Sequence, residues 1–221
     1  MISKLTTLAI LMVAGLVAFA PAAGADILWE QTGFDPWGMG YFNSDSGAPP
    51  FGMTVHTVCD ITVDHAWAVE SVTMYFSAMD WSWGEAISQG YLHVFPKTGT
   101  FPTEDPTASQ LVPMTGTVMS GTPVGDYFEV TASGLSLMLE PGEYWISITP
   151  FAPSGFWGPE TCLSAATLIG DESPSYDPYA DPGPPAWYIM NPGMDAAILI
   201  QGNSTVATET STWGKVKALY K

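Results

Sequence analysis

Apolar and polar residues alternate with a period of two along much of the chain, which is the pattern of strands that are half-buried on a core. The clearest stretch runs from Leu135 to Thr149 (LSLMLEPGEYWISIT). It contains two alternating runs around Glu140-Pro141-Gly142, where Pro presets φ at the first central turn position and Gly supplies positive φ at the next. We therefore predict a β-hairpin here, at the centre of the fold. The residues expected to face the core are Leu135, Leu137, Leu139, Tyr144, Ile146 and Ile148.

Similar short runs recur along the chain, separated by turns rich in Gly and Pro, and no amphipathic helical run is present. About nine short strands of this kind are typical of sandwiches and barrels. We predict an all-β fold, and more specifically a two-sheet antiparallel β-sandwich that is jelly-roll-like. Further residues expected on the inner faces are Cys59, Ile61, Val63, Val72, Met74, Phe76, Leu92, Val94, Ile198 and Ile200.

The first 25 residues have the layout of a secretory signal peptide. Lys4 is followed by an apolar stretch from Leu5 to Ala20 and then by Ala23-Gly24-Ala25, a small-x-small cleavage site. We predict cleavage after Ala25 and export to the cell surface or the medium. An uncleaved anchor is the alternative, although the apolar stretch is short for a span of about 20 residues. No later segment is apolar enough to cross a membrane, so we expect no transmembrane span after cleavage.

The body of the chain, residues 26–202, is predicted to be one β-sandwich domain, and it is followed by two short segments. Residues 203–212 (NSTVATETST) are polar and of low complexity, which indicates a linker. Residues 213–221 (WGKVKALYK) combine two aromatic residues with three lysines. They are interpreted either as a sorting or attachment signal or as a frayed tail.

The charge of the body is strongly one-sided. Residues 26–202 carry 21 acidic residues and one base, Lys97, for a net charge of −20, and the chain has no Arg. Such a surface repels phosphate backbones and anionic lipids, so we expect no nucleic-acid partner. The acidity itself is typical of proteins adapted for solubility or for a salty or calcium-rich exterior.

Cys59 and Cys162 are the only cysteines. An even number in an exported chain predicts one disulfide between them. That bond would close a loop of about 100 residues and contribute about 4–5 kcal/mol in the chain-entropy model. Two buried thiols are the alternative, and a zinc site is not expected from two such distant cysteines.

No catalytic motif is present. The sequence has no His-Glu-x-x-His zinc helix, no Gly-x-Ser-x-Gly elbow and no phosphate-binding P-loop. His56, His65 and His93 are isolated in sequence; two of them could meet across a sheet, but a single His on a strand is usually structural. We therefore expect no enzyme.

One acidic segment could bind calcium. Hard cations prefer several oxygen ligands from a flexible segment, and the segment Asp171 to Pro185 is predicted to be a loop rich in Pro, Asp and Tyr. The alternative is a solvated acidic loop without a metal. The candidate Ca²⁺ ligands are Asp171, Glu172, Asp177 and Asp181.

Aromatic residues gather in or beside the predicted loops. Exposed rings can stack on sugars while nearby acids or amides fix the orientation. The alternative is that these rings cap the ends of the sandwich. The candidate ligand-binding residues are Trp81, Trp83, Trp157, Tyr176 and Tyr179, with Trp187 and Tyr188 beside them.

Several segments resemble a group of secreted bacterial β-sandwich domains, the choice-of-anchor and PEP-CTERM-like exported proteins. The segments are TVCDITVDHAWAVESVTMYF (57–76), LEPGEYWISI (139–148), Phe156-Trp157-Gly158 and DAAILIQG (195–202). Members usually have Asp-Asp-Phe where this chain has Cys59-Asp60-Ile61. The tail resembles short terminal signals of the form Trp-Gly-x-x-Lys-x-Leu-Tyr.

The resemblance implies exposure at the cell surface and no particular reaction. The expected function is therefore an exported, non-catalytic protein with a structural or adhesive role at the bacterial cell surface. A carbohydrate-binding module, stabilised by Ca²⁺, is the alternative. The corresponding partners would be surface proteins or a cell-surface glycan.

Overall fold

The structure is a computed structural model of the chain. It describes residues 24–33, 40–45, 54–77, 87–106, 109–122, 125–151, 161–177, 186–189 and 191–204. The predicted signal peptide up to residue 23, most of the linker and the tail lie outside these residues. No helix in the described part of the chain is long and apolar enough to cross a membrane.

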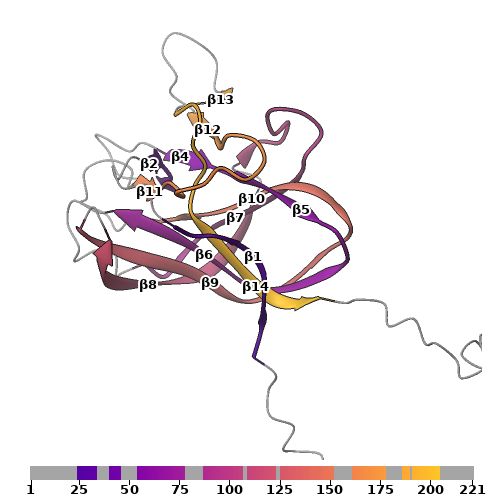
Figure 1. Cartoon of the computed structure of the whole chain (residues 1–221), viewed down its shortest axis with the longest axis horizontal. Helices are drawn as coiled ribbons and strands as arrows, with labels where there is room; N and C mark the ends of the chain where they lie inside the picture. Colours follow the sequence, from indigo (N-terminus) through magenta and orange to yellow (C-terminus); the bar gives the residue numbers. More distant parts are fainter. Residues whose placement is uncertain are drawn as a thin grey trace, which may run out of the picture.

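Fourteen β-strands make up the described fold (Figure 1). They are β1 Asp26–Gln31, β2 Gly40–Phe42, β3 Ser44–Asp45, β4 Thr54–Thr57, β5 Cys59–Val63, β6 Trp67–Ser77, β7 Gln89–Pro96, β8 Gln110–Thr122, β9 Gly125–Leu139, β10 Gly142–Pro150, β11 Thr161–Leu163, β12 Pro174–Asp177, β13 Ala186–Ile189 and β14 Ile198–Ser204. All paired strands are antiparallel. The predicted all-β antiparallel class is confirmed.

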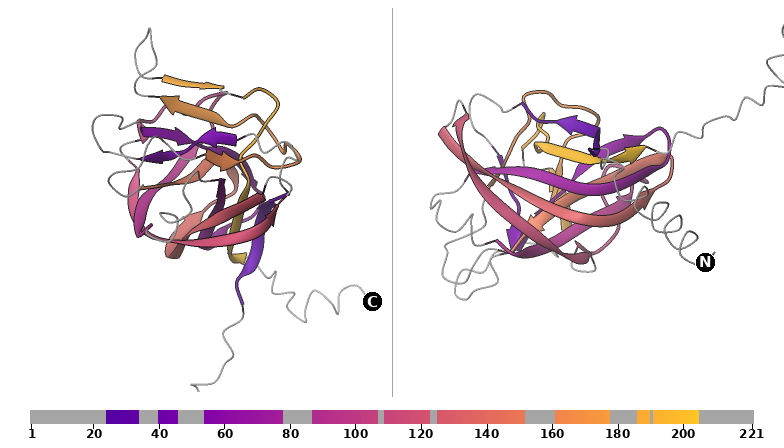
Figure 2. Two further views of the ribbon diagram at one scale, coloured as in Figure 1. Left: turned by 90° about the vertical axis from the view of Figure 1, so that its left-hand side faces the viewer. Right: turned by 90° about the horizontal axis from the view of Figure 1, so that it is seen from below.

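Ten strands form one large sheet, whose main path is β1-β14-β6-β9-β8-β7-β10-β5, with β2 and β11 attached beside β6. The sheet curves back on itself, as the right-hand view of Figure 2 shows, around the main hydrophobic core. Buried residues from both ends of the path meet in that core: Ile61 on β5 and Ile146 on β10 belong to the same cluster as Met74 on β6 and Ile200 on β14. The large sheet is therefore nearly barrel-like.

Strand β8 connects the two halves of the large sheet by changing partners. Its first residues, 110–113, pair with β7, and from Met114 onward it pairs with β9. A strand of 13 residues is long enough to serve both neighbours.

A smaller sheet of four strands, in the order β13-β12-β4-β3, lies against the outer face of β7 and β10 (Figures 1 and 2). Trp145 on β10 and Phe95 on β7 pack there with Val58, which follows β4, and with Trp187 on β13. Strand β10 is thus covered on both faces.

The period-two pattern predicted the inner face of most strands correctly. Val72, Met74 and Phe76 on β6 are fully buried, as are Ile198 and Ile200 on β14. Cys59, Ile61 and Val63 on β5 are also buried. Apolar positions at this spacing therefore identified one wall of the core wherever a strand has a single buried face.

The predicted hairpin is wrong. β9 ends at Leu139 and β10 begins at Gly142, as the turn predicts, but the two strands do not pair with each other. β9 pairs with β6 and β8, whereas β10 pairs with β5 and β7. The turn at Pro141 is instead an arch between the two halves of the large sheet.

Candidate functional site

A buried group of polar side chains joins the small sheet to the outer face of the large one. We call it the interlayer network. It comes from β4, β7, β10, β12 and the residue between β2 and β3, and every member is buried. Its members are Asn43, His56, Thr57, His93, Thr149 and Ser175.

Asn43 determines which groups of the network donate hydrogen bonds and which accept them. Its Oδ1 accepts from the backbone N–H of Thr57 at 3.2 Å, and its Nδ2 donates to the carbonyl of Ile148 at 3.0 Å. An amide N–H can only donate and a carbonyl can only accept, so the side-chain amide has one orientation. Oδ1 also lies 2.6 Å from Oγ1 of Thr149, which must therefore donate its hydroxyl proton to Asn43.

This chain of hydrogen bonds sets the tautomer of His93. Because the hydroxyl proton of Thr149 is already given to Asn43, its oxygen accepts from Nε2–H of His93 at 2.8 Å. Nδ1 of His93 is then the unprotonated nitrogen, and it accepts from Oγ of Ser109 at 2.8 Å. Both nitrogens of this neutral ring are satisfied inside the protein.

His56 completes the network but leaves one donor unpaired. Its Nδ1 lies 3.3 Å from Nε2 of His93, which carries a proton, so Nδ1 of His56 must be the acceptor. The proton of His56 is then on Nε2, which is buried and finds no partner in the described part of the chain. A second proton on His56 would place two N–H groups against each other.

Both imidazoles are held in the neutral form. Burial lowers the pKa of His56 to about 4, and the charges of Asp45 and Asp105 oppose this shift only in part. Burial, followed by the neighbouring His56, lowers the pKa of His93 well below its ordinary value. The pair can therefore serve as a buried hydrogen-bonding element of the fold at neutral pH.

Aromatic rings surround the outer side of the network. Tyr91 lies 5.5 Å from His56 and Tyr176 lies 6.4 Å from it, measured between ring centroids. Tyr176 on β12 also packs at 5.4 Å on Trp187, its register partner on β13. Both rings of this pair are half-buried, and Nε1 of Trp187 donates to the carbonyl of Glu104 at 3.2 Å.

The one base of the body is used in a second polar cluster. Nζ of Lys97 lies 2.5 Å from Oδ2 of Asp60 and 2.7 Å from Oδ2 of Asp171, and it sits 4.9 Å above the ring of Trp145. Burial alone would lower the pKa of Lys97, but hydrogen bonds and charges from the two carboxylates outweigh it and raise the pKa. This cluster holds the Gly170–Asp171 turn against the start of β5.

A third cluster surrounds the buried carboxyl of Asp195. It accepts hydrogen bonds from Gln31 at 2.5 Å, from Ser173, and from the backbone of Ala196 at 2.9 Å. Burial nonetheless raises the pKa of Asp195 to about 7, because these donors offset only part of the desolvation. The carboxyl ties β1 to the segments that precede β12 and β14.

The two candidate calcium ligands whose side chains the structure describes, Asp171 and Glu172, have other partners. Asp171 pairs with Lys97, and Oε1 of Glu172 accepts from the backbone of Gly193 at 2.6 Å. Asp181 and the side chain of Asp177 lie outside the described residues. Within the described ranges, no group of three or more His, Cys, Asp or Glu residues is placed to hold a metal ion.

Of the candidate ligand-binding aromatics, the structure describes Tyr176 alone. Trp81, Trp83, Trp157 and Tyr179 lie outside the described residues. The segment that carries Tyr176 was expected to be a loop, but it contains strand β12. The sequence offered no signal for the interlayer network either, because Asn43, His56, His93 and Thr149 come from four separate segments.

The structure does not support the predicted disulfide. Cys59 and Cys162 are both buried thiols in the same core cluster. Sγ of Cys59 points to the carbonyl of Ala196 at 3.4 Å, and burial, followed by the charge of Asp195, raises the pKa of Cys59 well above its ordinary value. A hydrogen bond to a carbonyl is available to a thiol and not to a half-cystine.

Comparisons of the chain with protein-family models, with curated proteins and with solved structures gave no match. The resemblance to choice-of-anchor and PEP-CTERM-like proteins therefore stays a prediction.

Proposed function

We propose that the chain is an exported, non-catalytic β-sandwich protein, jelly-roll-like in architecture, with a structural or adhesive role at the bacterial cell surface. The curved ten-stranded sheet, whose two halves enclose one core, supports the sandwich description. The predicted signal peptide and the resemblance to surface-exposed domains support the location.

The observation that carries this proposal is the internal use of groups that could otherwise do chemistry. His56 and His93 are buried and neutral, and their contacts link the two sheets. Lys97, the one base of the body, is paired with Asp60 and Asp171. Polar groups arranged in this way strengthen the attachment of one layer to another and suit a rigid scaffold.

A carbohydrate-binding module is the second candidate, and the pair formed by Tyr176 and Trp187 favours it. The two half-buried rings lie side by side on the outer sheet, and exposed portions of aromatic faces can stack on sugars. A structural Ca²⁺ ion remains part of this alternative, although Asp171 and Glu172 already have other partners.

A glycan array distinguishes the two candidates. The mature chain, residues 26–221, would be screened with and without Ca²⁺, together with the variant Tyr176→Ala. The structural proposal predicts no reproducible glycan binding by folded protein. A glycan bound by the mature chain and lost in Tyr176→Ala, with the melting temperature preserved, would overturn it in favour of the module.

The exposed aromatic ring of Phe101 provides a matched control. Phe101 is 39% exposed, lies in the turn after β7 and is not a member of the Tyr176–Trp187 pair. Phe101→Ala removes a surface ring of similar size without touching that pair. Glycan binding that is lost equally in both variants would indicate non-specific adhesion and would not support the module.

A further inference from the structure

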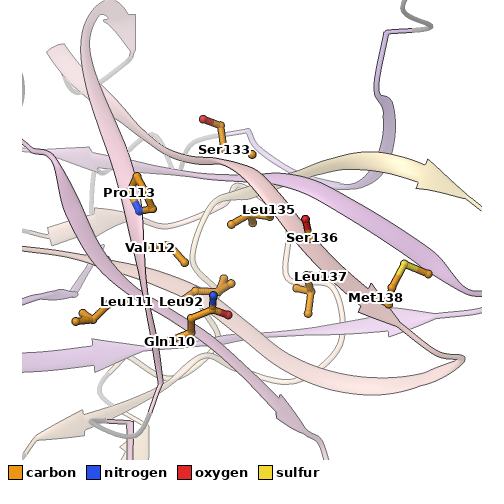
Figure 3. A pocket seen from close by; sticks show the side chains of 11 residues that line it. Leu92, Gln110, Leu111, Val112, Pro113, Ser133, Leu135, Ser136, Leu137 and Met138 are labelled. Carbon is orange, nitrogen blue, oxygen red and sulfur yellow. The ribbon is translucent and has the colours of Figure 1, made fainter.

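A groove lies between β8 and β9 on the surface of the large sheet (Figure 3). Its volume is about 370 Å³, and it is continued by a smaller hollow of about 210 Å³ that reaches Val94 and Phe95 on β7. We call it the β8/β9 groove. Leu111 and Val112 line it from β8, and Leu135, Leu137 and Met138 line it from β9.

The groove exists because β9 separates from β8 at Gly134. The ladder between the two strands ends at the pair Met114–Ala132. No earlier residue of β8 pairs with a later residue of β9. Gly134 has φ of +68°, a left-handed conformation that favours glycine. Between the pairs Ser71–Ser133 and Val69–Leu137, three residues of β9 face one residue of β6, so β9 bulges at this point.

Two unpaired strand edges border the groove. Residues 110–113 of β8 pair with β7 alone, and residues 133–139 of β9 pair with β6 alone, among the described strands. Pro113 lies on the β8 edge, where a missing N–H is tolerated. The β9 edge, which has no Pro, is therefore the one that can pair with an additional strand.

The side chains at these edges are apolar and accessible. Leu111 and Met138 are each 55% exposed, and they line the groove from β8 and β9 respectively. An open strand edge flanked by apolar side chains binds extended peptides through main-chain hydrogen bonds and side-chain pockets. The groove therefore has the chemistry of a strand-addition site.

The C-terminal end of the described fold lies close to this site. β14 ends at Ser204, which is paired with Trp67 on β6, and Trp67 is paired in turn with Leu139 at the end of β9. Two strand spacings, about 10 Å, separate Ser204 from Leu139. The eight residues 205–212 can span up to about 26 Å when extended, so residues 213–221 can reach the groove.

The direction of approach also fits. β14 and β9 run the same way, because each is antiparallel to β6. A segment that leaves β14 and turns back into the groove would enter at Leu139 and run antiparallel to β9. Antiparallel addition is the geometry that a short return connection permits.

Residues 213–221 have the composition of such a strand. Val216, Ala218 and Tyr220 alternate with Lys215, Lys217 and Leu219, and the segment contains no Pro. The alternating set of Val, Ala and Tyr could face the groove, while lysines on the other side would lie above a body that carries a net charge of −20. Length, position, alternation and charge all point to the same segment.

We propose that residues 213–221 of this chain bind the β8/β9 groove as an additional strand, antiparallel to β9. The segment thereby covers Leu111 and Met138 and supplies hydrogen-bonding partners for the open edge of β9. This proposal concerns the tail alone and does not depend on the function proposed above.

Hydrogen–deuterium exchange of the mature chain tests this proposal. Amides of residues 214–221 are expected to exchange at least about tenfold more slowly than those of residues 205–212, because a docked strand must open before it exchanges. The variant Val216→Asp should abolish that protection and also speed exchange in residues 133–138. Val206→Asp makes the same change in the linker, and it should leave residues 214–221 and residues 133–138 protected from exchange.

A second pair of variants tests the groove itself. Met138→Asp places a charge on the groove wall, whereas Ile27→Asp makes the same type of change at a position of β1 that is 57% exposed. Met138→Asp should remove protection from residues 214–221, and Ile27→Asp should retain it. Slow exchange of the β6 amides shows that a variant is folded. Because Val216 lies outside the described fold, Val216→Asp tests docking independently of the stability of the core.

Two results would overturn the proposal. Residues 214–221 that exchange as fast as the linker would show that the tail does not dock. Protection that appears only in a dimer, resolved by light scattering over a dilution series, would assign the groove to the tail of a second copy. Protection in a monomer, lost in both Val216→Asp and Met138→Asp, is the result that the proposal requires.

Discussion

Nζ of Lys97 lies 2.5 Å from Oδ2 of Asp60, and both side chains are almost completely buried. This pair brings together the start of β5 and the end of β7, two segments that the sequence separates by 37 residues. Asp171 extends the pair, since its carboxylate contacts Lys97 and its backbone N–H donates to both oxygens of Asp60.

Removing Lys97 should destabilise the fold far more than removing the carboxylate of Asp171. Lys97→Met leaves the buried charge of Asp60 without its cation, which we expect to cost about 2–4 kcal/mol. Asp171 is 58% exposed, so Asp171→Asn should cost at most about 1 kcal/mol. Urea unfolding of the two variants measures both changes, and equal losses would contradict a central role for Lys97.

Gly170 should tolerate alanine much less well than Gly193. Both have positive φ, +90° and +80°, so both variants incur the backbone strain of about 1–2 kcal/mol. A Cβ at Gly170 would also lie 2.4 Å from Oδ2 of Asp60, whereas a Cβ at Gly193 meets nothing within 4 Å. We expect Gly170→Ala to lower the thermal midpoint clearly more than Gly193→Ala. Similar midpoints would show that Asp60 moves aside without loss.

The two histidines of the interlayer network should respond differently to substitution by Phe. His93→Phe leaves the hydroxyls of Ser109 and Thr149 without their ring partner, and we expect a loss of about 2–4 kcal/mol. His56→Phe removes a ring that already has an unpaired buried donor, so its effect at pH 7.5 should stay within about 1 kcal/mol. Chemical denaturation at pH 7.5 measures both.

His56 should also make the protein sensitive to acid. Its pKa falls from 6.5 to about 4 on folding, so the unfolded chain takes up the proton first as the pH falls. Stability from this group is complete above pH 6.5 and is lost progressively between 6.5 and 4. At pH 5 the loss is about 2 kcal/mol, and the difference in stability between His56→Phe and the parent chain should shift by that amount between pH 7.5 and pH 5. A constant difference would contradict the buried neutral imidazole.

Asp195 should give the opposite dependence on pH. Its pKa rises from 3.8 to about 7 on folding, so the folded protein retains a proton that the unfolded chain has lost. Stability from this group is complete below pH 3.8 and is lost as the pH rises toward 7, on the order of 4 kcal/mol in total. Asp195→Asn, which cannot ionise, should therefore become more stable relative to the parent chain as the pH rises from 4 to 8. No change in that difference would show that Asp195 is ionised throughout.

The thiols of Cys59 and Cys162 should resist alkylation in the folded protein. Both are fully buried, and Cys59 has a raised pKa, so iodoacetamide should modify neither until the chain is denatured. Intact-mass measurement before and after denaturation counts the modified thiols. A protein that stays unmodified even when denatured without reductant would contain the disulfide that the sequence predicted.

Sequence patterns identified the strands that have one buried face, and they were less informative where a strand has two. Alternation marked Val72, Met74 and Phe76 as core because the outer face of β6 is more polar. On β10, however, Trp145, Ser147 and Thr149 alternate with the residues that were expected to face the core, and all three are nonetheless buried beneath the small sheet. A polar residue in a strand predicts that its side chain faces solvent, but the side chain can be buried where a second layer supplies its hydrogen-bonding partners.

The arch at Pro141 has a related explanation. A Pro-Gly turn predicts that the chain reverses, and it does, but the local signal is the same for a tight hairpin and for an arch between halves of a sheet. Partner choice depended instead on distant strands, since β10 pairs with β5 and β7. Similarly, Gly134 lies inside a long strand, and only its positive φ reveals the bulge that opens the β8/β9 groove.

The interlayer network was beyond prediction for the same reason. Its hydrogen bonds join residues as far apart as Asn43 and Thr149, 106 positions along the chain. The sequence allowed that two of the three histidines could meet across a sheet, and His56 and His93 do meet, at 3.3 Å. Which two, and through which nitrogens, depends on how the small sheet packs on β7 and β10.

Surface labelling of intact cells tests the proposed function most directly. A membrane-impermeant amine reagent would be applied to cells that produce the chain, and the labelled protein would be identified by mass. The account predicts labelled protein on intact cells, with an N-terminus at Asp26 and no Met1–Ala25 segment. Protein that is labelled only after lysis and that retains residues 1–25 would contradict an exported surface protein.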